Sequence, residues 1–155
     1  MAAVRFVHEQ LQSLEGSDAV ALDRYLKDLL GQFTSSIVGG RMAVELDLQP
    51  VRIDGKRAVP VGILVNEIAT NAIKHAFVDG DSGSLSVTLA DVDGDIALEI
   101  ANSGPPFPGD VDLDSPETLG LQLVVGLIDQ LGGSLDLVRS PHPVFSIRFP
   151  RDAGA

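Results

Sequence analysis

The hydrophobic period changes several times along this 155-residue chain, and the order of the changes limits the folds that it can adopt. Apolar residues three and four positions apart predict helices over residues 2–14, 21–35, 61–77 and 119–131. Alternating apolar residues predict strands over residues 44–48, 51–53, 84–90, 96–101, 134–138 and 144–149. This order predicts an α+β sandwich, in which helices are layered on one face of a mixed, mostly antiparallel sheet.

The composition fits a single domain with an aliphatic core. Hydrophobic residues make up 45% of the chain and aromatic residues 5%, and there is no Trp. A domain of this length buries about two thirds of the surface of its unfolded chain, so it can form a core. The absence of Cys excludes disulfides, thiol catalysis and zinc–thiolate sites. It is also consistent with a reducing compartment, and we expect a cytoplasmic protein.

The charge balance limits the partners of the chain. There are 22 acidic and 11 basic residues, which give a net charge of -11. Such a surface repels the phosphates of nucleic acids and of anionic membranes. Neither a signal peptide nor a long apolar run is visible. We therefore expect no nucleic-acid partner and no membrane contact for this segment, and any phosphate site must consist of a few local donors.

The helix predicted over residues 61–77, with Pro60 in its first turn, carries four different polar side chains on one face. Their spacings of i, i+4, i+7 and i+8 place them within about a third of the helix circumference: Glu67, Asn71, Lys74 and His75. The polar face of an ordinary surface helix usually carries interchangeable Lys and Glu. A carboxylate, an amide, an ammonium and an imidazole in one file therefore indicate a functional surface.

These side chains match part of what a magnesium nucleotide requires. Asn71 offers a carbonyl oxygen, Lys74 a positive charge, and Glu67 a carboxylate one turn away. Residues 102–118 contain four prolines and two glycines, which predicts a long loop. The following helix begins near Gly120, where free N–H groups can bind phosphates. No Walker A sequence occurs, so a P-loop site is excluded.

Four segments resemble the ATP-binding catalytic domain of sensor histidine kinases. NEIATNAIKHAF, residues 66–77, matches that family's N box, which has the pattern NELxTNAxKHAF. LGLQLVVGLIDQLGGSL, residues 119–135, resembles the second glycine box with its helix and strand. Residues 100–107 align with the first glycine box, and FSIRFP resembles the closing strand. The chain is most similar to the second His-kinase dimerisation class and its HWE relatives, within the superfamily that includes gyrase and MutL.

The resemblance implies a Bergerat-type two-layer α/β sandwich preceded by part of a helical dimerisation hairpin. Residues 1–36 are then the end of the dimerisation region and a linker helix, residues 37–150 the ATP-binding domain, and residues 151–155 a tail. The implied activity is that of a two-component sensor kinase, which transfers the γ-phosphate of ATP to a histidine. A response regulator is the implied partner, and the N-terminal helices are expected to form a homodimer in the full-length protein.

By the same resemblance, the cofactors are ATP and Mg²⁺. Glu67 corresponds to the N-box acid and Asn71 to the magnesium ligand, and both are expected on the metal side. The expected catalytic residues are Glu67, Asn71 and Lys74. The expected cofactor-binding residues are Asn71, Lys74, His75, Asn102, Gly104, Leu119, Gly120 and Leu121. The loop that ends at Thr118 corresponds to the ATP lid.

Three positions depart from the family pattern. Asn102 stands where the family has an aspartate that accepts a hydrogen bond from the adenine amino group, and a neutral acceptor would weaken that contact by about 1–2 kcal/mol. Pro106 and Thr118 replace glycines that let the backbone approach the nucleotide. Three interpretations stay open: a working kinase domain with atypical boxes, a weak nucleotide binder, and a non-catalytic module of this fold that docks a response regulator or a partner subunit.

The phosphoacceptor is not evident in this chain. His8 is followed by an acid, as in an acceptor box, but VRFVHEQLQSL, residues 4–14, resembles the second helix of the family's hairpin. We therefore expect the acceptor outside this chain. His142, between two prolines, is predicted to be exposed. A serine kinase that acts on an anti-anti-sigma factor shares the fold, but the resemblance of the N-terminal helices to a dimerisation hairpin argues against it.

Overall fold

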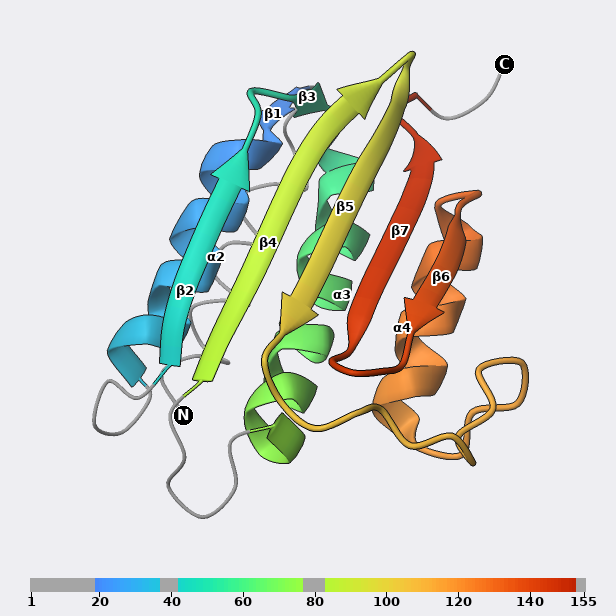
Figure 1. Cartoon of the computed structure of the whole chain (residues 1–155). Coiled ribbons are helices and arrows are strands. Elements are labelled where there is room, and N and C mark those ends of the chain that lie inside the picture. Colours follow the sequence, from blue (N-terminus) through green and yellow to red (C-terminus); the bar gives the residue numbers. More distant parts are fainter. Residues whose placement is uncertain (1–18, 37–41, 77–82, 153–155) are drawn as a thin grey trace.

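The computed structural model describes residues 19–36, 42–76 and 83–152 (Figure 1). In chain order, the elements are β1 (Val20–Ala21), α2 (Leu22–Ser36), β2 (Met42–Leu48), β3 (Arg52–Ile53), α3 (Gly55–Ala76), β4 (Gly83–Val92), β5 (Asp95–Asn102), α4 (Leu119–Gln130), β6 (Ser134–Val138) and β7 (Val144–Pro150). The predicted helix over residues 2–14, and His8 within it, lie outside the described residues.

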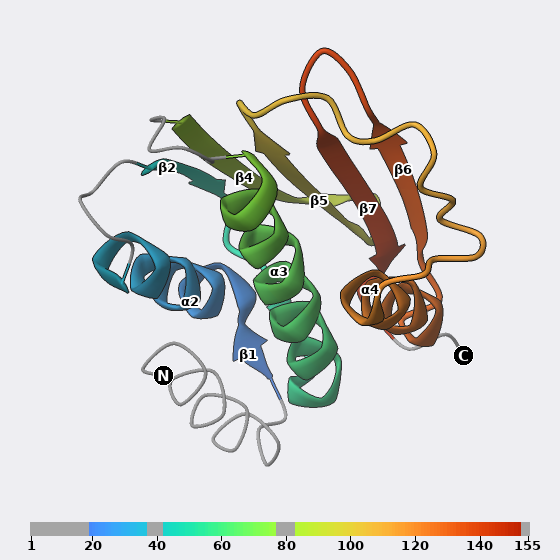
Figure 2. The same cartoon turned by 90° about the horizontal axis from the view of Figure 1, so that it is seen from below.

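Five strands form one sheet in the order β2-β4-β5-β7-β6. The β2–β4 pair is parallel and the other three pairs are antiparallel. Seen from below, α2, α3 and α4 all lie on the same side of this sheet (Figure 2). The predicted α+β sandwich with helices on one face of a mixed, mostly antiparallel sheet is therefore confirmed.

The core lies between the sheet and the helices, and it follows the predicted periods. Alternate residues of β4, β5 and β7 are buried toward the helices, while their neighbours lie on the open face: Leu85, Val87, Leu89, Ile96, Leu98, Ile100, Phe145, Ile147 and Phe149 are the buried set. The helical stripe of α2 adds Leu22, Tyr25, Leu26, Leu29 and Leu30 to the same buried cluster. The core is almost entirely aliphatic, as the composition predicts.

The α3 helix begins earlier than predicted. The sequence suggests a turn at residues 54–55 and a start near Pro60, but the helix begins at Gly55 and Pro60 lies inside it. The Asp54 carboxylate accepts a hydrogen bond from the Lys56 N–H at 2.8 Å, and the Asp54 carbonyl accepts one from the Ala58 N–H at 3.0 Å. Asp54 is therefore a helix cap, because its side chain binds a first-turn N–H that has no partner in the helix.

One short element was not predicted. The two residues of β1 pair with β3 in a separate antiparallel sheet, with Val20 opposite Ile53. The remaining predicted strands, and the helices α2 and α4, agree with the structure to within a few residues. The residues that join β4 to β5, VDGD, have the composition of a hairpin turn, and both central residues of the turn in the structure have positive φ, 54° at Asp93 and 87° at Gly94. Among residues 19–36, 42–76 and 83–152, no helix is both long and apolar enough to cross a membrane.

Candidate functional site

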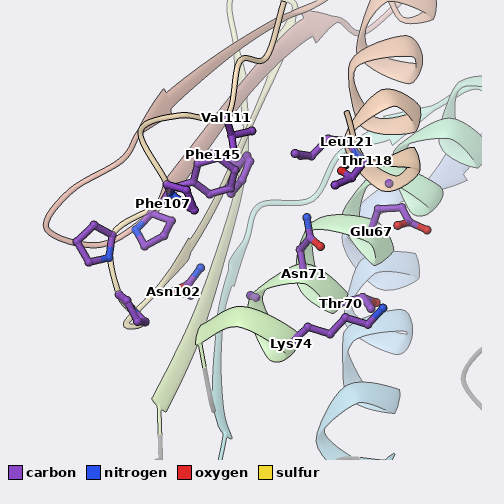
Figure 3. Close-up of a pocket in the computed structure, with 16 residues that line it drawn as sticks. Glu67, Thr70, Asn71, Lys74, Asn102, Phe107, Val111, Thr118, Leu121 and Phe145 are labelled. Carbon is purple, nitrogen blue, oxygen red and sulfur yellow. Dashed lines mark hydrogen bonds between the residues drawn. The ribbon is translucent and has the colours of Figure 1, made fainter. Parts of the chain in front are cut away.

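A cavity of about 740 Å³ opens between α3, the start of α4 and the loop of residues 103–118. It lies at the end of the sheet where β5 finishes and β7 begins, since Ala101 is paired with Val144 there. Figure 3 shows side chains from these elements turned toward the same space. Long loops of this kind often form part of a functional site.

The α3 wall carries most of the polar side chains expected from the sequence. Glu67, Asn71 and Lys74 line the cavity together with Thr70. Asn71 points into the middle of the space, and Glu67 lies toward the start of α4 (Figure 3). The side chain of His75 is outside what the structure describes. Thr70 was missed, although it is three residues from Glu67 and four from Lys74, a spacing that places it on the same face.

The second wall is the N-terminus of α4. Thr118 is the N-cap, and its Oγ1 accepts a hydrogen bond from the Leu121 N–H at 3.3 Å. Helix geometry leaves the N–H groups of Leu119 and Gly120 without an acceptor inside the helix. Gly120 and Leu121 line the cavity. Leu119 is not among the lining residues and is 81% exposed, so only its backbone is left for the role expected of this residue.

Gly120 leaves room for the Glu67 carboxylate beside the start of α4. A Cβ atom at this position would lie 3.1 Å from Glu67 Oε2. The carboxylate therefore lies at the positive end of the α4 dipole, where a negative charge is stabilised. The N-terminus of α4 and the polar face of α3 thus form one continuous polar surface along one side of the cavity.

The opposite end of the cavity is apolar. The rings of Phe107 and Phe145 meet edge to face, with centroids 5.6 Å apart and an interplanar angle of 88°. Pro106, Pro108 and Val111 extend this wall along the loop. The sequence did not identify either aromatic residue as part of the site, since Phe145 has the pattern of an ordinary core residue and Phe107 lies in a loop without periodicity. The cavity therefore offers an apolar slot at one end and polar groups at the other, the form typical of small-molecule sites.

The arrangement of the cavity agrees with the result of a comparison with known protein families. Residues 40–139 match the model of the histidine kinase-like ATPase domain. The chain belongs to this family. Blue-light-activated histidine kinase 2 of Erythrobacter litoralis (strain HTCC2594) is 31% identical over 115 residues, which cover 71% of this chain and 33% of that protein. Blue-light-activated histidine kinase 1 of the same strain is 26% identical and is covered over 32% of its length, so the chain spans about a third of these curated relatives.

Solved structures of histidine kinases share the fold. The histidine kinase domain of a blue-light activated kinase from Erythrobacter litoralis superimposes with a TM-score of 0.83 at 24% identity, over 97% of this chain and 72% of that one. A further structure of the same Erythrobacter kinase gives a TM-score of 0.79 at 26% identity, over 85% of this chain and 42% of that one. The alternative of a degenerate module is not favoured by the family match and the curated histidine kinase relatives.

All three residues that depart from the family pattern, Asn102, Pro106 and Thr118, line the cavity of this histidine kinase-like ATPase domain. Pro106 forms part of its apolar wall, and Thr118 caps α4. Both replace expected glycines, yet the cavity is open with these residues in place. Gly104 is buried and is not among the lining residues. Its N–H donates to Asn102 Oδ1 at 2.9 Å, so the first glycine of the box and Asn102 stabilise one turn of the loop.

The charges around the cavity are few and of opposite sign. Among the residues described as lining it, Lys74 is the only cation and Glu67 the only carboxylate. In the part of the chain that the structure describes, no group of three or more His, Cys, Asp or Glu residues is arranged to hold a metal ion.

Proposed function

We propose that the cavity binds ATP together with Mg²⁺, and that the domain transfers the γ-phosphate to a histidine. The observation that carries this proposal is the polarity of the cavity: Asn71, Lys74 and the free N–H groups of α4 lie along one side, and the Phe107–Phe145 pair closes the other end. A nucleotide has the matching polarity, with an apolar base and a charged phosphate chain.

The donor set fits a magnesium ion that is bound mainly through the nucleotide. Mg²⁺ typically takes one or two protein oxygens and completes its shell with phosphates and waters. The Asn71 amide oxygen and the Glu67 carboxylate would supply those protein ligands from adjacent turns of α3. When bound, the ion neutralises charge that develops on the phosphate oxygens.

The proposed transfer requires positioning more than covalent help from the protein. A histidine nitrogen attacks the γ-phosphorus, a P–N bond forms, the bond between the γ-phosphorus and the β,γ-bridging oxygen breaks, and ADP leaves with the electron pair. Lys74 would stabilise the phosphate charge, and Glu67 and Asn71 would orient the phosphate chain. These three residues are the proposed catalytic residues.

Further residues have proposed binding roles. The N–H groups of Leu119 and Gly120 would bind the phosphates, Leu121 would close the wall between them and the base, and the family resemblance assigns His75 a phosphate-side role. Asn102 accepts a bond from the adenine amino group while it also holds the Gly104 N–H, because an amide oxygen has two lone pairs. Gly104 acts by shaping this turn.

We also propose how this domain belongs to a larger kinase. Residues 1–36 would be the end of a dimerisation region, residues 37–150 the ATP-binding domain and residues 151–155 a tail. The acceptor histidine would lie outside this chain, on a cytoplasmic kinase that forms a homodimer and passes the phosphate to a response regulator. The sensor kinases among the relatives support this arrangement.

Calorimetric titration with ADP and Mg²⁺ tests the proposal directly. We expect binding to the unaltered chain and an affinity at least about tenfold weaker for Asn71→Ala, since the metal loses a protein ligand. Gln130→Ala is the matched control, because Gln130 is an exposed amide of α4 outside the cavity, and it should bind like the unaltered chain. Absence of binding to the unaltered chain would contradict the nucleotide site.

Transfer itself is tested in the full-length protein with γ-labelled ATP. A phosphate bound to histidine is labile in acid and stable in alkali, whereas phosphoserine has the opposite behaviour. An alkali-stable, acid-labile product that disappears in Asn71→Ala is expected. An acid-stable product would instead support the serine kinase alternative, and nucleotide binding without any labelled product would support a non-catalytic module.

A further inference from the structure

The loop of residues 103–118 is fastened to the rest of the molecule unevenly. Its first residues are bonded to the sheet: the Ser103 N–H donates to the Ser84 carbonyl at 3.0 Å, and the Ser84 N–H donates to Ser103 Oγ at 2.8 Å. His142, in the turn between β6 and β7, places Nδ1 2.7 Å from the Gly104 carbonyl oxygen. The start of the loop is therefore attached on two sides.

Arg139, the residue that follows β6, makes the most contacts with the first half of the loop, residues 103–111. Its Nη1 donates to the Pro108 carbonyl at 2.6 Å and its Nη2 to the Val111 carbonyl at 2.7 Å. Its own carbonyl accepts from the Phe107 N–H at 2.8 Å, and its guanidinium carbon lies 5.5 Å from the centroid of the Phe107 ring. A planar guanidinium is suited to this task, because it donates in several directions while it stacks on a ring.

The second half of the loop has contacts of a different kind. The hydrogen bonds described for it stay within the loop or reach the adjacent α4. Asp112 accepts from the Asp114 N–H at 2.9 Å through Oδ1 and from the Ser115 N–H at 3.3 Å through its carbonyl. Gln122 of α4 donates to the Pro116 carbonyl at 3.0 Å. Such local bonds can move together with the segment that contains them.

We propose that Arg139 is a positioning residue for the cavity: it holds residues 107–111 as a fixed wall and confines closure over a bound molecule to residues 112–117. The wall in question includes Phe107, Pro108 and Val111, all of which line the cavity. A wall that is already in place does not have to be ordered when the ligand binds, so binding is tighter. Only the identity of the ligand as a nucleotide rests on the proposed function.

Amide hydrogen exchange measured by NMR, together with ADP titration, tests this role in three variants of the chain. Arg139→Gln removes the positive charge and the guanidinium that donates to two carbonyl groups. Arg139→Lys keeps the charge without the planar guanidinium. Arg148→Gln is the control, because Arg148 lies on β7, outside the cavity, in an exposed ion pair with Asp95. The exchange readout needs no nucleotide, so it is independent of the proposed function.

In the unaltered chain, we expect slower exchange at Phe107 and Val111 than at Leu113 and Asp114. In Arg139→Gln, exchange at Phe107 and Val111 should rise to the level of the second half, while amides of the central strand β5 stay protected. If this wall is then formed in about a tenth of the molecules, the dissociation constant for ADP rises about tenfold. Arg139→Lys should lie between the two, and Arg148→Gln should match the unaltered chain.

Unchanged exchange at Phe107 and Val111 in Arg139→Gln would overturn the proposal, as would faster exchange with unchanged ADP affinity. If Arg139→Gln also loosens β5, the same comparison is made with Arg139→Lys. If the unaltered chain does not bind ADP, the nucleotide assignment fails, and the exchange data alone decide whether Arg139 holds the wall.

Discussion

At the scale of single residues, Asn102 shows how one side chain serves both the loop and the cavity. It lies at the end of β5, lines the cavity, and uses Oδ1 to accept from the Gly104 N–H at 2.9 Å. An amide offers one oxygen for both tasks, whereas a carboxylate offers two oxygens and a negative charge. The family's aspartate could therefore hold the loop with one oxygen and bind a ligand with the other.

Asn102→Asp should tighten ADP binding by about tenfold, since a charged acceptor is worth about 1–2 kcal/mol more than a neutral one. Titration with ADP and, separately, with inosine diphosphate measures this. Inosine has a carbonyl oxygen in place of the adenine amino group, so the gain should be absent with inosine diphosphate. An equal gain in affinity for both nucleotides, or no gain for either, would show that Asn102 does not contact the adenine amino group.

At the scale of elements, the contact between α2 and α3 depends on Tyr25 and Gly62. Tyr25 is 4% exposed, and a Cβ atom at Gly62 would overlap its hydroxyl group. The hydroxyl oxygen is buried and has no hydrogen-bond partner among the described residues. Close helix packing is thus achieved by a glycine, at the cost of one polar atom that is neither solvated nor bonded.

Tyr25→Phe should raise the free energy of unfolding by about 1 kcal/mol, because it removes this unbonded atom and leaves the ring in place. It should also change the response to alkali. Burial raises the pKa of Tyr25 from its ordinary value near 10 to about 12. The unfolded chain therefore loses the proton first, and stability that is intact below pH 10 falls between about pH 10 and pH 12.

Urea denaturation of both chains across this pH range measures the effect. The loss in the unaltered chain should reach about 2–3 kcal/mol beyond that in Tyr25→Phe. Tyr25 is the only Tyr and there is no Trp, so the absorbance of the phenolate reports its ionisation without interference. Equal alkaline losses in the two chains would mean that the hydroxyl is not buried as described.

At the scale of the whole molecule, Arg57 connects three elements that are far apart in the sequence. From the first turn of α3, its Nη2 donates to the Leu131 carbonyl after α4 at 2.8 Å and to the Pro150 carbonyl at the end of β7 at 2.6 Å. Its guanidinium carbon also lies 5.8 Å from the centroid of the Phe149 ring. This contact joins the helix layer to the sheet at the end opposite to the cavity.

Arg57→Lys should lower the free energy of unfolding by about 1.5–3 kcal/mol, since an ammonium cannot reproduce the charge-assisted bonds and the ring contact together. Arg52→Lys is the matched control: Arg52 is exposed, and its one described hydrogen bond, to the Ala19 carbonyl, is 3.4 Å long. The urea midpoint should fall for Arg57→Lys and change little for Arg52→Lys. A similar midpoint for the two variants would contradict the role of Arg57.

Much of the fold could be predicted because the signals are local. The alternation in residues 84–101 and the stripe of α2 depend on neighbours along the chain, and both agree with the structure. The predicted start of α3, near Pro60, was wrong. The cap contacts made by Asp54 begin the helix upstream of the proline. The β1 strand was missed because its two residues form a strand only through pairing with β3.

The candidate site was predictable on its helical side and at Asn102. Glu67, Asn71 and Lys74 share a face by spacing alone, and they do line the cavity. The apolar wall was not predictable, since Phe107 and Phe145 are 38 positions apart and meet only through the folding of the loop onto β7. His142 is exposed as predicted, but its bond to Gly104 could not be foreseen for the same reason.

The sequence by itself determined the order of the main helices and strands from α2 onward, the polar face of α3 and the membership of the histidine kinase-like ATPase family. Periodicity and motif matching are properties of the order of residues along the chain, so they need no coordinates. The tertiary structure alone decided that the Glu67 carboxylate lies beside Gly120 at the start of α4, that Asn102 accepts a hydrogen bond from the loop, and that Arg139 binds the loop. These depend on contacts between distant segments, whose geometry is set by packing and not by local pattern.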